Sequence, residues 1–514
     1  MRAAAPPLAL TGQDLRCEDV AGVAREKQPV GIAPAAQAAV DRSRAVVEAA
    51  VRDEKGKPVY GVTTGFGELA TTRIPPSRAR ELQRNLVLST AAGVGAPYPT
   101  EVVRAMMLLR ANALAKGRSG IRRSTLDLLV SMLNAGVHPV VPSQGSVGAS
   151  GDLAPLAHLA LAMMGEGECE HGGGVAPAAR ALSAAGLAPV ELAEKEGLSL
   201  INGTQAMTAM AALATVDGAR LLATAQVAAA MSLEALLGSV APFDPRLHEA
   251  RPHPGQRAVA ENLRKLLAGS GIVASHAGCD RVQDPYTLRC IPQVLGPARD
   301  ALAEARRVVE IEANSANDNP LVLDADVVSG GNFHGQPIAL VLAYLAPAMA
   351  EIASFAERRV ARLVDPNLSE GLPAFLVPDS GVQSGYMIPQ YVAAALVSEN
   401  KQLAWPPVVD SIPTSANQED HVSMGAHAAL STRRIVENAQ RVVGVELLCA
   451  AQALALRAPL SPAPATAAAL AAVRRRVPPL VADRYLKPEM DAAAELVASG
   501  EVLAAAESVC GPLA

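Results

Sequence analysis

The chain of 514 residues carries a formal net charge of −5 and a sequence pI near 6.0, and it contains no block rich in lysine and arginine. This charge balance argues against a nucleic acid as partner. Half of the residues are hydrophobic but only 3% are aromatic, so alanine, leucine and valine must build most of the core. Alanine and leucine are strong helix formers, and the composition therefore predicts a mainly α-helical protein.

The cysteines and apolar runs bear on where the protein resides. Six cysteines are scattered without the spacing of a metal site, which indicates reduced thiols. The apolar stretch near the N-terminus is interrupted by Pro6 and Pro7 and is too short for a signal peptide. The run 337–350 ends before Glu351 and falls short of the roughly 20 residues of a membrane span. We expect a cytoplasmic protein with no membrane partner and no metal.

Helical periodicity dominates the N-terminal third of the chain. It predicts helices over 12–25, 35–51, 82–88, 101–116 and 124–135. Ser77 is the expected N-cap of the third. The glycine-rich segment 59–67 breaks the pattern and holds Tyr60. A tyrosine in such a loop is usually a packed edge residue; the alternative is a phenol brought to a site, because loops carry much of catalysis.

The segment 145–156 contains three small residues in a row, Ala149, Ser150 and Gly151. In such a stretch the amide nitrogen of Gly151 can approach the carbonyl carbon of Ala149 and close a five-membered ring. Loss of water from the ring and from the Ser150 hydroxyl would leave a methylidene, which is a strong electrophile. The alternative is a flexible turn before a helix.

The rest of the chain is again mostly helical in pattern. Helices are expected over 153–164, 190–197, 206–237, 304–316, 337–364 and 387–403, from Gln283–Arg289 onward, over about 35 residues after 413–421, and after 459–464. The segments 242–254 and 269–281 are expected to be irregular, and Gly330–Gly335 is a second glycine loop. We predict an N-terminal domain over 1–205, a helical bundle over 206–458 and a C-terminal helical segment over 459–514.

Common catalytic motifs do not account for these features. The glycine loops lack the Gly-Lys-Ser/Thr of a phosphate-binding loop. Ser150 is not in a nucleophile elbow, because Asp152 stands where the second glycine would be. His421 and His427 are six residues apart, which does not place them on one helix face for zinc.

What remains is a set of polar groups at loops and expected helix starts. Each one alone is more often a helix cap than a functional group. Together they supply a phenol (Tyr60 or Tyr286), a guanidinium (Arg289), two amides (Asn202, Gln283) and a carboxylate (Glu419). An amino-acid substrate suits this set, because Arg289 can hold a carboxylate bidentately and a tyrosine of lowered pKa can take a carbon-bound proton. Spacing does not show whether these groups meet.

From about residue 58 to the C-terminal helices, the chain resembles the histidine ammonia-lyase family. The resemblance rests on Tyr60–Gly67, Gly145–Leu156, Asn202–Gln205, Gln283–Arg289, Gly331–His334 and Ser415–Met424. It implies the ammonia-lyase fold, with an N-terminal domain that bears a 4-methylidene-imidazol-5-one (MIO) group and a long central helical bundle. It also implies a homotetramer with active sites built from more than one subunit, and no external cofactor.

The resemblance further implies roles for individual residues. Ser150, cyclised with Ala149 and Gly151, would become the MIO electrophile that takes the α-amino group of the substrate as leaving group. Tyr60 would be the base for the β-proton and Arg289 the carboxylate anchor. The remaining implied site residues are Asn202, Gln283 and Tyr286 as supports of the MIO group and substrate, Phe333 as pocket lining and Glu419 facing the side chain or amine.

The expected reaction is the conversion of L-histidine to trans-urocanate and ammonia, a step of histidine degradation. One residue departs from the pattern: histidine-specific members carry Ser-His where this chain has Ser89 and Thr90. Trp405 also stands where histidine lyases have a histidine. The alternatives are an MIO-dependent lyase or aminomutase for another polar, cationic or aromatic amino acid, and a non-catalytic helical assembly or binding protein of the same fold.

Overall fold

The structure is a computed structural model that describes residues 6–53, 58–148 and 152–514. Long helices and a few short strands make up these residues, which confirms the mainly α-helical prediction. The chain divides into two compact units, and each unit combines separate stretches of sequence. The three-way division drawn from the sequence stays a prediction.

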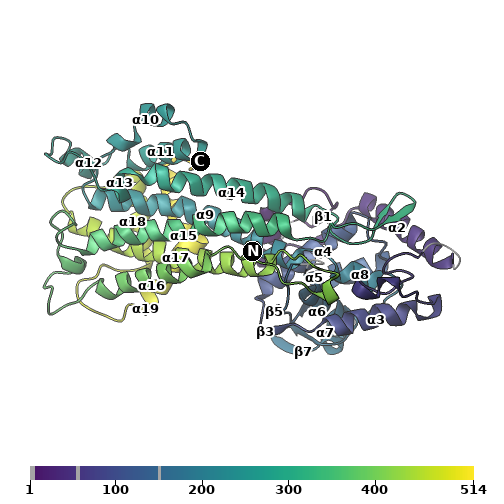
Figure 1. Cartoon of the computed structure of the whole chain (residues 1–514). Helices are drawn as coiled ribbons and strands as arrows, with labels where there is room; N and C mark the ends of the chain where they lie inside the picture. Colours follow the sequence, from purple (N-terminus) through teal and green to yellow (C-terminus); the bar gives the residue numbers. More distant parts are fainter. Residues whose placement is uncertain (1–5, 54–57, 149–151) are drawn as a thin grey trace. The chain divides into compact units, whose positions relative to one another are not determined.

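The first unit comprises Met1–Val216, Ala305–Ala343 and Pro406–Leu430. Its helices are α1 (Cys17–Glu26), α2 (Pro34–Arg52), α3 (Ala79–Thr90), α4 (Thr100–Ala115), α5 (Arg123–Ala135), α6 (Leu153–Met163), α7 (Ala178–Ala184) and α8 (Glu196–Ile201). Helix α4 is buried from Val102 to Ala115 and packs against α5 (Figure 1). Helix α1 also packs against α4. Most of the buried side chains of α4 are apolar, although Arg104, Arg110 and Asn112 are buried among them, and α4 forms the centre of this core.

Short strands connect the helices of the first unit. Strands β1 (Leu8–Leu10) and β2 (Val30–Ile32) pair in parallel; β3 (Val94–Pro97) pairs antiparallel with β5 (Pro142–Gln144); β4 (His138–Pro139), β6 (Glu168–His171) and β7 (Gly174–Pro177) form a sheet in that order; β8 (Leu321–Leu323) and β9 (Asp326–Val328) form a hairpin. The β3–β5 pair joins the chain that follows α3 to the chain that precedes residue 145.

The second unit comprises Asp217–Glu304, Tyr344–Trp405 and Ser431–Ala514. Its own helices are α10 (Pro245–Ala250), α11 (Pro254–Leu267), α12 (Gly271–Ser275), α13 (Tyr286–Arg289), α16 (Met387–Leu403), α18 (Pro464–Arg476), α19 (Lys487–Ser499) and α20 (Glu501–Cys510). Helix α18 packs against α11, α19 and α20. A fully buried ion pair, Arg359 Nε to Glu446 Oε1 at 2.5 Å, lies in its core.

Four long helices contribute residues to both units: α9 (Gln205–Ala235), α14 (Ile291–Ala313), α15 (Gln336–Val364) and α17 (Gly425–Leu456). By length and composition α9, α15 and α17 are apolar enough to cross a membrane. However, 72%, 56% and 78% of their most apolar windows are buried within the protein. Their apolar side chains therefore serve mainly as core.

Several helix boundaries differ from the sequence predictions. Ser77 is not an N-cap, because Pro76–Arg78 form a 3-10 turn and α3 begins after it at Ala79. The helix predicted over 190–197 is wrong: α8 begins only at Glu196, after Lys195 adopts a left-handed conformation. Two segments expected to be irregular contain α10 and α12, whose first turns are capped by the Asp244 and Ser270 side chains.

The predicted helix 304–316 is the end of the longer α14, which continues through Pro297. The other predicted boundaries agree within about three residues, except that α1 begins at Cys17 and not near residue 12. The helix expected to follow Ala149–Gly151 is present as α6, which begins at Leu153.

Candidate active site

The segment Ala149–Gly151 lies outside the described residues, but both of its flanks are fixed by distant segments of the chain. The carbonyl oxygen of Val147 accepts the N–H of Met424 at 2.8 Å. The carbonyl oxygen of Gly148 accepts the hydroxyl of Ser423 at 3.0 Å and the N–H of Gly335 at 3.3 Å. The glycine loop before α15 and the segment before α17 therefore meet at the residues that precede Ala149.

Gly148 packs so closely that no side chain fits. Its φ is +72°, and a Cβ atom there would lie 2.2 Å from Ser423 Oγ and 2.9 Å from the backbone nitrogen of Gly425. Both the conformation and the space demand glycine. This flank is therefore a closely packed cradle.

Asp152 fixes the other flank. It is fully buried; Oδ1 accepts the Ser146 hydroxyl at 2.8 Å and Oδ2 accepts the Met207 N–H at 2.9 Å. Its own N–H donates to the carbonyl of Gly203 at 2.6 Å. Burial raises its pKa to about 6, although the bonds from Met207 and Ser146 lower it. The sequence patterns assigned Asp152 no role; an acidic residue at the start of an otherwise apolar helix was the signal.

Asn202 is the C-cap of α8 and is buried. Its carbonyl oxygen accepts Arg110 Nη1 at 2.9 Å, and the same nitrogen donates to Gln205 Oε1 at 2.9 Å. Arg110 also donates to the carbonyl of Ser199. Burial lowers the pKa of Arg110 to about 10, so its guanidinium remains charged at neutral pH. A buried cation thus holds the backbone from which the Asn202 side chain projects.

Tyr60 is half-buried in a tight turn. Its phenolic oxygen accepts the N–H of Gly67 at 3.0 Å, and its ring meets Phe66 edge-on at 6.2 Å. Burial raises the pKa of Tyr60, the Gly67 bond lowers it, and the nearby negative charge of Glu419 raises it again. The net direction is upward, opposite to the lowered pKa expected for a base.

Glu419 faces the Tyr60 loop from the chain before α17. Its Oε2 accepts the Thr414 hydroxyl at 2.8 Å, and backbone bonds between the same two residues close the turn around the 3-10 helix Ser415–Asn417. A Cβ atom on Gly67 would lie 2.5 Å from Ser415 Oγ, so the two loops touch. The first unit therefore brings the predicted base, Tyr60, close to Glu419, which was predicted to face the substrate.

Phe333 and Thr90 occupy two further positions in the first unit. Phe333 is half-buried, one residue before His334, whose Nε2 donates to the His421 carbonyl at 3.3 Å. Thr90 is the half-buried last residue of α3. His158 accepts the Gly93 N–H at 3.1 Å through Nε2, so this ring nitrogen is engaged with the backbone.

Gln283, Tyr286 and Arg289 lie in the second unit. Gln283 and Arg289 line one hollow of about 360 Å³, and the guanidinium carbon of Arg289 lies 4.7 Å from the centroid of the Tyr286 ring. Among the residues that the structure describes, Arg289 has no carboxylate partner and its buried Nε has no hydrogen-bond acceptor. This guanidinium is available to bind an anion.

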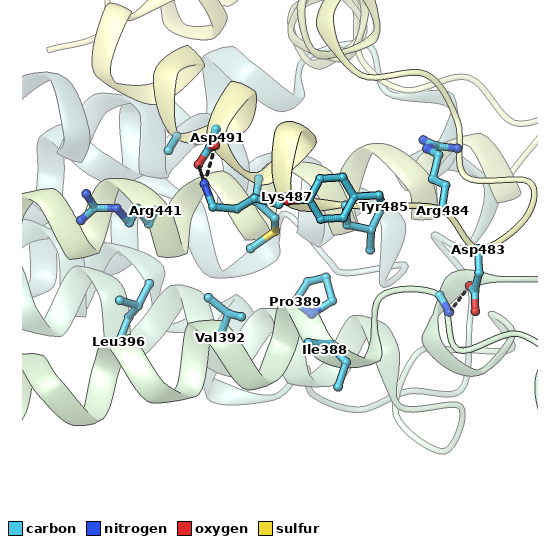
Figure 2. Close-up of a pocket in the computed structure, with 14 residues that line it drawn as sticks. Ile388, Pro389, Val392, Leu396, Arg441, Asp483, Arg484, Tyr485, Lys487 and Asp491 are labelled. Carbon is cyan, nitrogen blue, oxygen red and sulfur yellow. Dashed lines mark hydrogen bonds and ion pairs between the residues drawn. The ribbon is translucent and has the colours of Figure 1, made fainter.

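A larger groove of about 740 Å³ lies elsewhere in the second unit (Figure 2). Ile388, Pro389 and Val392 of α16 line one side of it, opposite Tyr485 and Lys487. Lys487 is paired with Asp491 at 2.5 Å. None of the candidate site residues lines this groove, whose lining combines these apolar side chains with charged ones such as Asp483 and Lys487.

Comparison with known proteins identifies the family. Residues 15–475 match the model of the aromatic amino acid lyases. The chain belongs to this family. It is 54% identical to a histidine ammonia-lyase of Gloeobacter violaceus over 98% of both chains, and 56% identical to one of an Anaeromyxobacter strain over 96% of this chain and 99% of the relative.

Solved structures of the same family share the fold. A tyrosine aminomutase of Streptomyces globisporus superposes with a TM-score of 0.93 at 39% identity, covering 98% of this chain and 99% of that one. A histidine ammonia-lyase of Trypanosoma cruzi superposes with a TM-score of 0.91 at 41% identity, covering 98% and 96%. The resemblance and the ammonia-lyase fold inferred from the motifs are confirmed, and the chain is an ammonia-lyase.

Proposed function

We propose that this lyase forms an MIO group from Ala149, Ser150 and Gly151 and converts L-histidine to trans-urocanate and ammonia. The observation that carries the proposal is the cradle of Gly148, Asp152, Gly335 and Ser423 around this segment. When formed, the MIO group supplies an electrophile for the α-amino group, which leaves poorly from an unactivated carbon. The named relatives at more than half identity support histidine as substrate.

The chain's own side chains would bind the substrate and move its proton. Arg289 would hold the α-carboxylate through two parallel N–H bonds. Tyr60 Oη would accept the β-proton, while the Gly67 N–H holds that oxygen in place. Glu419 would accept a hydrogen bond from the imidazole N–H, and the Asn202 amide would orient the reacting group. Phe333, Gln283 and Tyr286 would shape the pocket.

We further propose a cytoplasmic homotetramer with shared active sites. Large apolar side chains that lie open on the single chain support an assembly: Tyr286 is 68% exposed, Trp405 78% and Val409 81%. Such groups are typical of buried interface. Light scattering on the eluting protein would give the mass of the assembly, and a monomeric mass with full activity would contradict the proposal.

Two measurements test the reaction and the prosthetic group separately. Purified protein mixed with L-histidine should raise the absorbance at the band of urocanate, and no rise would refute histidine as substrate. The intact mass should be lower than the sequence mass by two waters, and an unshifted mass would refute the MIO group. Replacement of Ser150 by alanine should abolish turnover and restore the unmodified mass.

Thr90 favours a second candidate, an MIO-dependent lyase or aminomutase for another amino acid. The similarity to a tyrosine aminomutase supports it. A panel of amino acids with product analysis separates the candidates: cinnamate-like products or β-amino acids would indicate the second, and urocanate the first.

A further inference from the structure

A fully buried glutamine, Gln83, links the Tyr60 loop to the helix that ends at Asn202. It lies on α3. Its Nε2 donates to the carbonyl oxygen of Gly61 at 3.4 Å, and its Oε1 accepts the N–H of Leu198 at 3.1 Å. Gly61 directly follows Tyr60, and Leu198 lies in α8. One amide therefore joins two segments that carry candidate site residues.

The surrounding packing leaves this amide little freedom. A Cβ atom on Gly197 would lie 2.7 Å from the carbonyl oxygen of Gln83 and 3.1 Å from its Oε1. A Cβ atom on Gly61 would lie 2.4 Å from the Leu198 side chain, and Gly61 has a φ of +65°. The contact between α3, α8 and the Tyr60 loop is thus made at two glycines, with the Gln83 side chain between them.

Apolar packing also holds the Tyr60 loop. Val62 is buried in a cluster with Val47 and Val322. Apolar packing fixes position but tolerates small rotations, whereas a hydrogen bond to a backbone carbonyl also fixes orientation. The Gly61 carbonyl belongs to the residue that adjoins Tyr60 on its C-terminal side, so the bond from Gln83 restricts the direction in which Tyr60 projects.

We propose that Gln83 is a positioning residue, which aims the phenol of Tyr60 by holding the carbonyl of Gly61 against α8. The inference rests on the proposed role of Tyr60 as the base. A base displaced by about 1 Å loses up to about a hundredfold in rate, so loosening this loop lowers kcat. Substrate binding relies on other groups, and KM stays within about twofold.

The test is a cycle of four full-length proteins: the natural chain, Gln83→Met, Tyr60→Phe and the double variant. Methionine keeps the length and the apolar volume of the side chain but makes neither bond. We expect Gln83→Met to lower kcat about tenfold with the natural tyrosine. In the Tyr60→Phe background the same substitution should change the residual kcat by less than about twofold, because residues that act through one group are not additive.

Gln83→Glu is a second probe, in case the methionine variant folds poorly. It keeps an acceptor for the Leu198 N–H, but as a carboxylate it cannot donate to Gly61. Gln452→Glu is the matched control, since Gln452 is a buried amide that accepts the N–H of Leu480 at 3.0 Å and donates to its carbonyl at 2.9 Å. The control should change the thermal midpoint without changing kcat.

The outcomes separate this inference from the proposed function. A fully active Tyr60→Phe enzyme would overturn the role of the base and the inference with it. If Tyr60→Phe is impaired and Gln83→Met still lowers its residual kcat tenfold, the inference alone is overturned. A rise in KM with unchanged kcat would also overturn it, because that pattern indicates a lost substrate contact.

Discussion

Replacement of Asp152 by asparagine should make the protein more stable at pH 8 and less stable at pH 4. The ordinary pKa of 3.8 rises to about 6 because the carboxyl group is buried. Each pKa unit by which a group differs between the folded and unfolded states is worth about 1.4 kcal/mol. Ionised Asp152 therefore costs about 3 kcal/mol of folding stability above pH 7. The amide avoids this cost but hydrogen-bonds less well to Ser146 and Met207, which loses about 1 kcal/mol.

The net gain is therefore about 2 kcal/mol at pH 8. The sign follows from proton binding: between about pH 4 and 6 the folded chain holds a proton that the unfolded chain has lost, so the stability of the natural protein falls as pH rises through this window. Well below pH 4 the Asp152 carboxyl group is protonated in both the folded and the unfolded natural protein. The variant then differs only by its weaker hydrogen bonds, so it is the less stable of the two. The stability curves of the two proteins should cross near pH 4.5, where the cost of ionising Asp152 equals about 1 kcal/mol.

Scanning calorimetry at fixed protein concentration from pH 4 to 8 measures the difference. For a chain of 514 residues, 2 kcal/mol corresponds to about 2 °C in the unfolding midpoint. Glu196→Gln is the control of opposite sign. Burial alone would raise the pKa of Glu196, but bonds from Arg122, Ala193 and Thr125 lower it below the ordinary value. This control should lose stability at pH 8 and recover as pH falls; a difference for Asp152→Asn that does not vary with pH would refute the reasoning.

Three further changes test other regions of the molecule. Asp318→Asn should cost about 3–5 kcal/mol, measured by calorimetry, because it leaves the Lys195 ammonium buried without its partner at 2.8 Å; a loss below about 1 kcal/mol would contradict this. Arg289→Lys should raise KM about tenfold with kcat nearly unchanged, because lysine does not bind a carboxylate bidentately; an unchanged KM would remove Arg289 from the substrate site. Thr90→His should raise kcat/KM for histidine relative to tyrosine, since histidine lyases carry that residue; an unchanged ratio in competition assays would show that Thr90 does not set specificity.

The sequence predicts the long elements well because their signals are local. Apolar periodicity sufficed for α2, α4, α5 and α15, whose buried faces extend over many turns. Apolar periodicity failed where a few hydrogen bonds and ion pairs decide where a helix begins. Helix α8 begins at Glu196 because that carboxylate accepts the N–H of Ala193 and binds Arg122, and Arg122 is distant in sequence.

The same contrast between local and long-range signals applies to the candidate site. Loops with an unusual composition, such as the Tyr60 loop and the segment before Leu153, are visible in the sequence because glycine is conspicuous there. The buried side chains that hold these loops cannot be recognised in the sequence. Gln83 and Arg110 lie within ordinary helical patterns, and only their backbone partners reveal what they do. Those partners are 22 and 92 residues away along the chain.

The electrostatics of Tyr60 give a chemical reason for the proposed sharing of active sites between subunits. Tyr60 can take a carbon-bound proton only as the phenolate, yet burial and the charge of Glu419 both disfavour that form. The Gly67 N–H opposes them without reversing the direction. Within the described residues of the first unit, no cation lowers the pKa of Tyr60. Arg289 belongs to the second unit and lacks a carboxylate partner among the described residues. A guanidinium supplied by a neighbouring subunit would bind the substrate carboxylate and also lower the pKa of the phenol, so assembly would complete the base as well as the pocket.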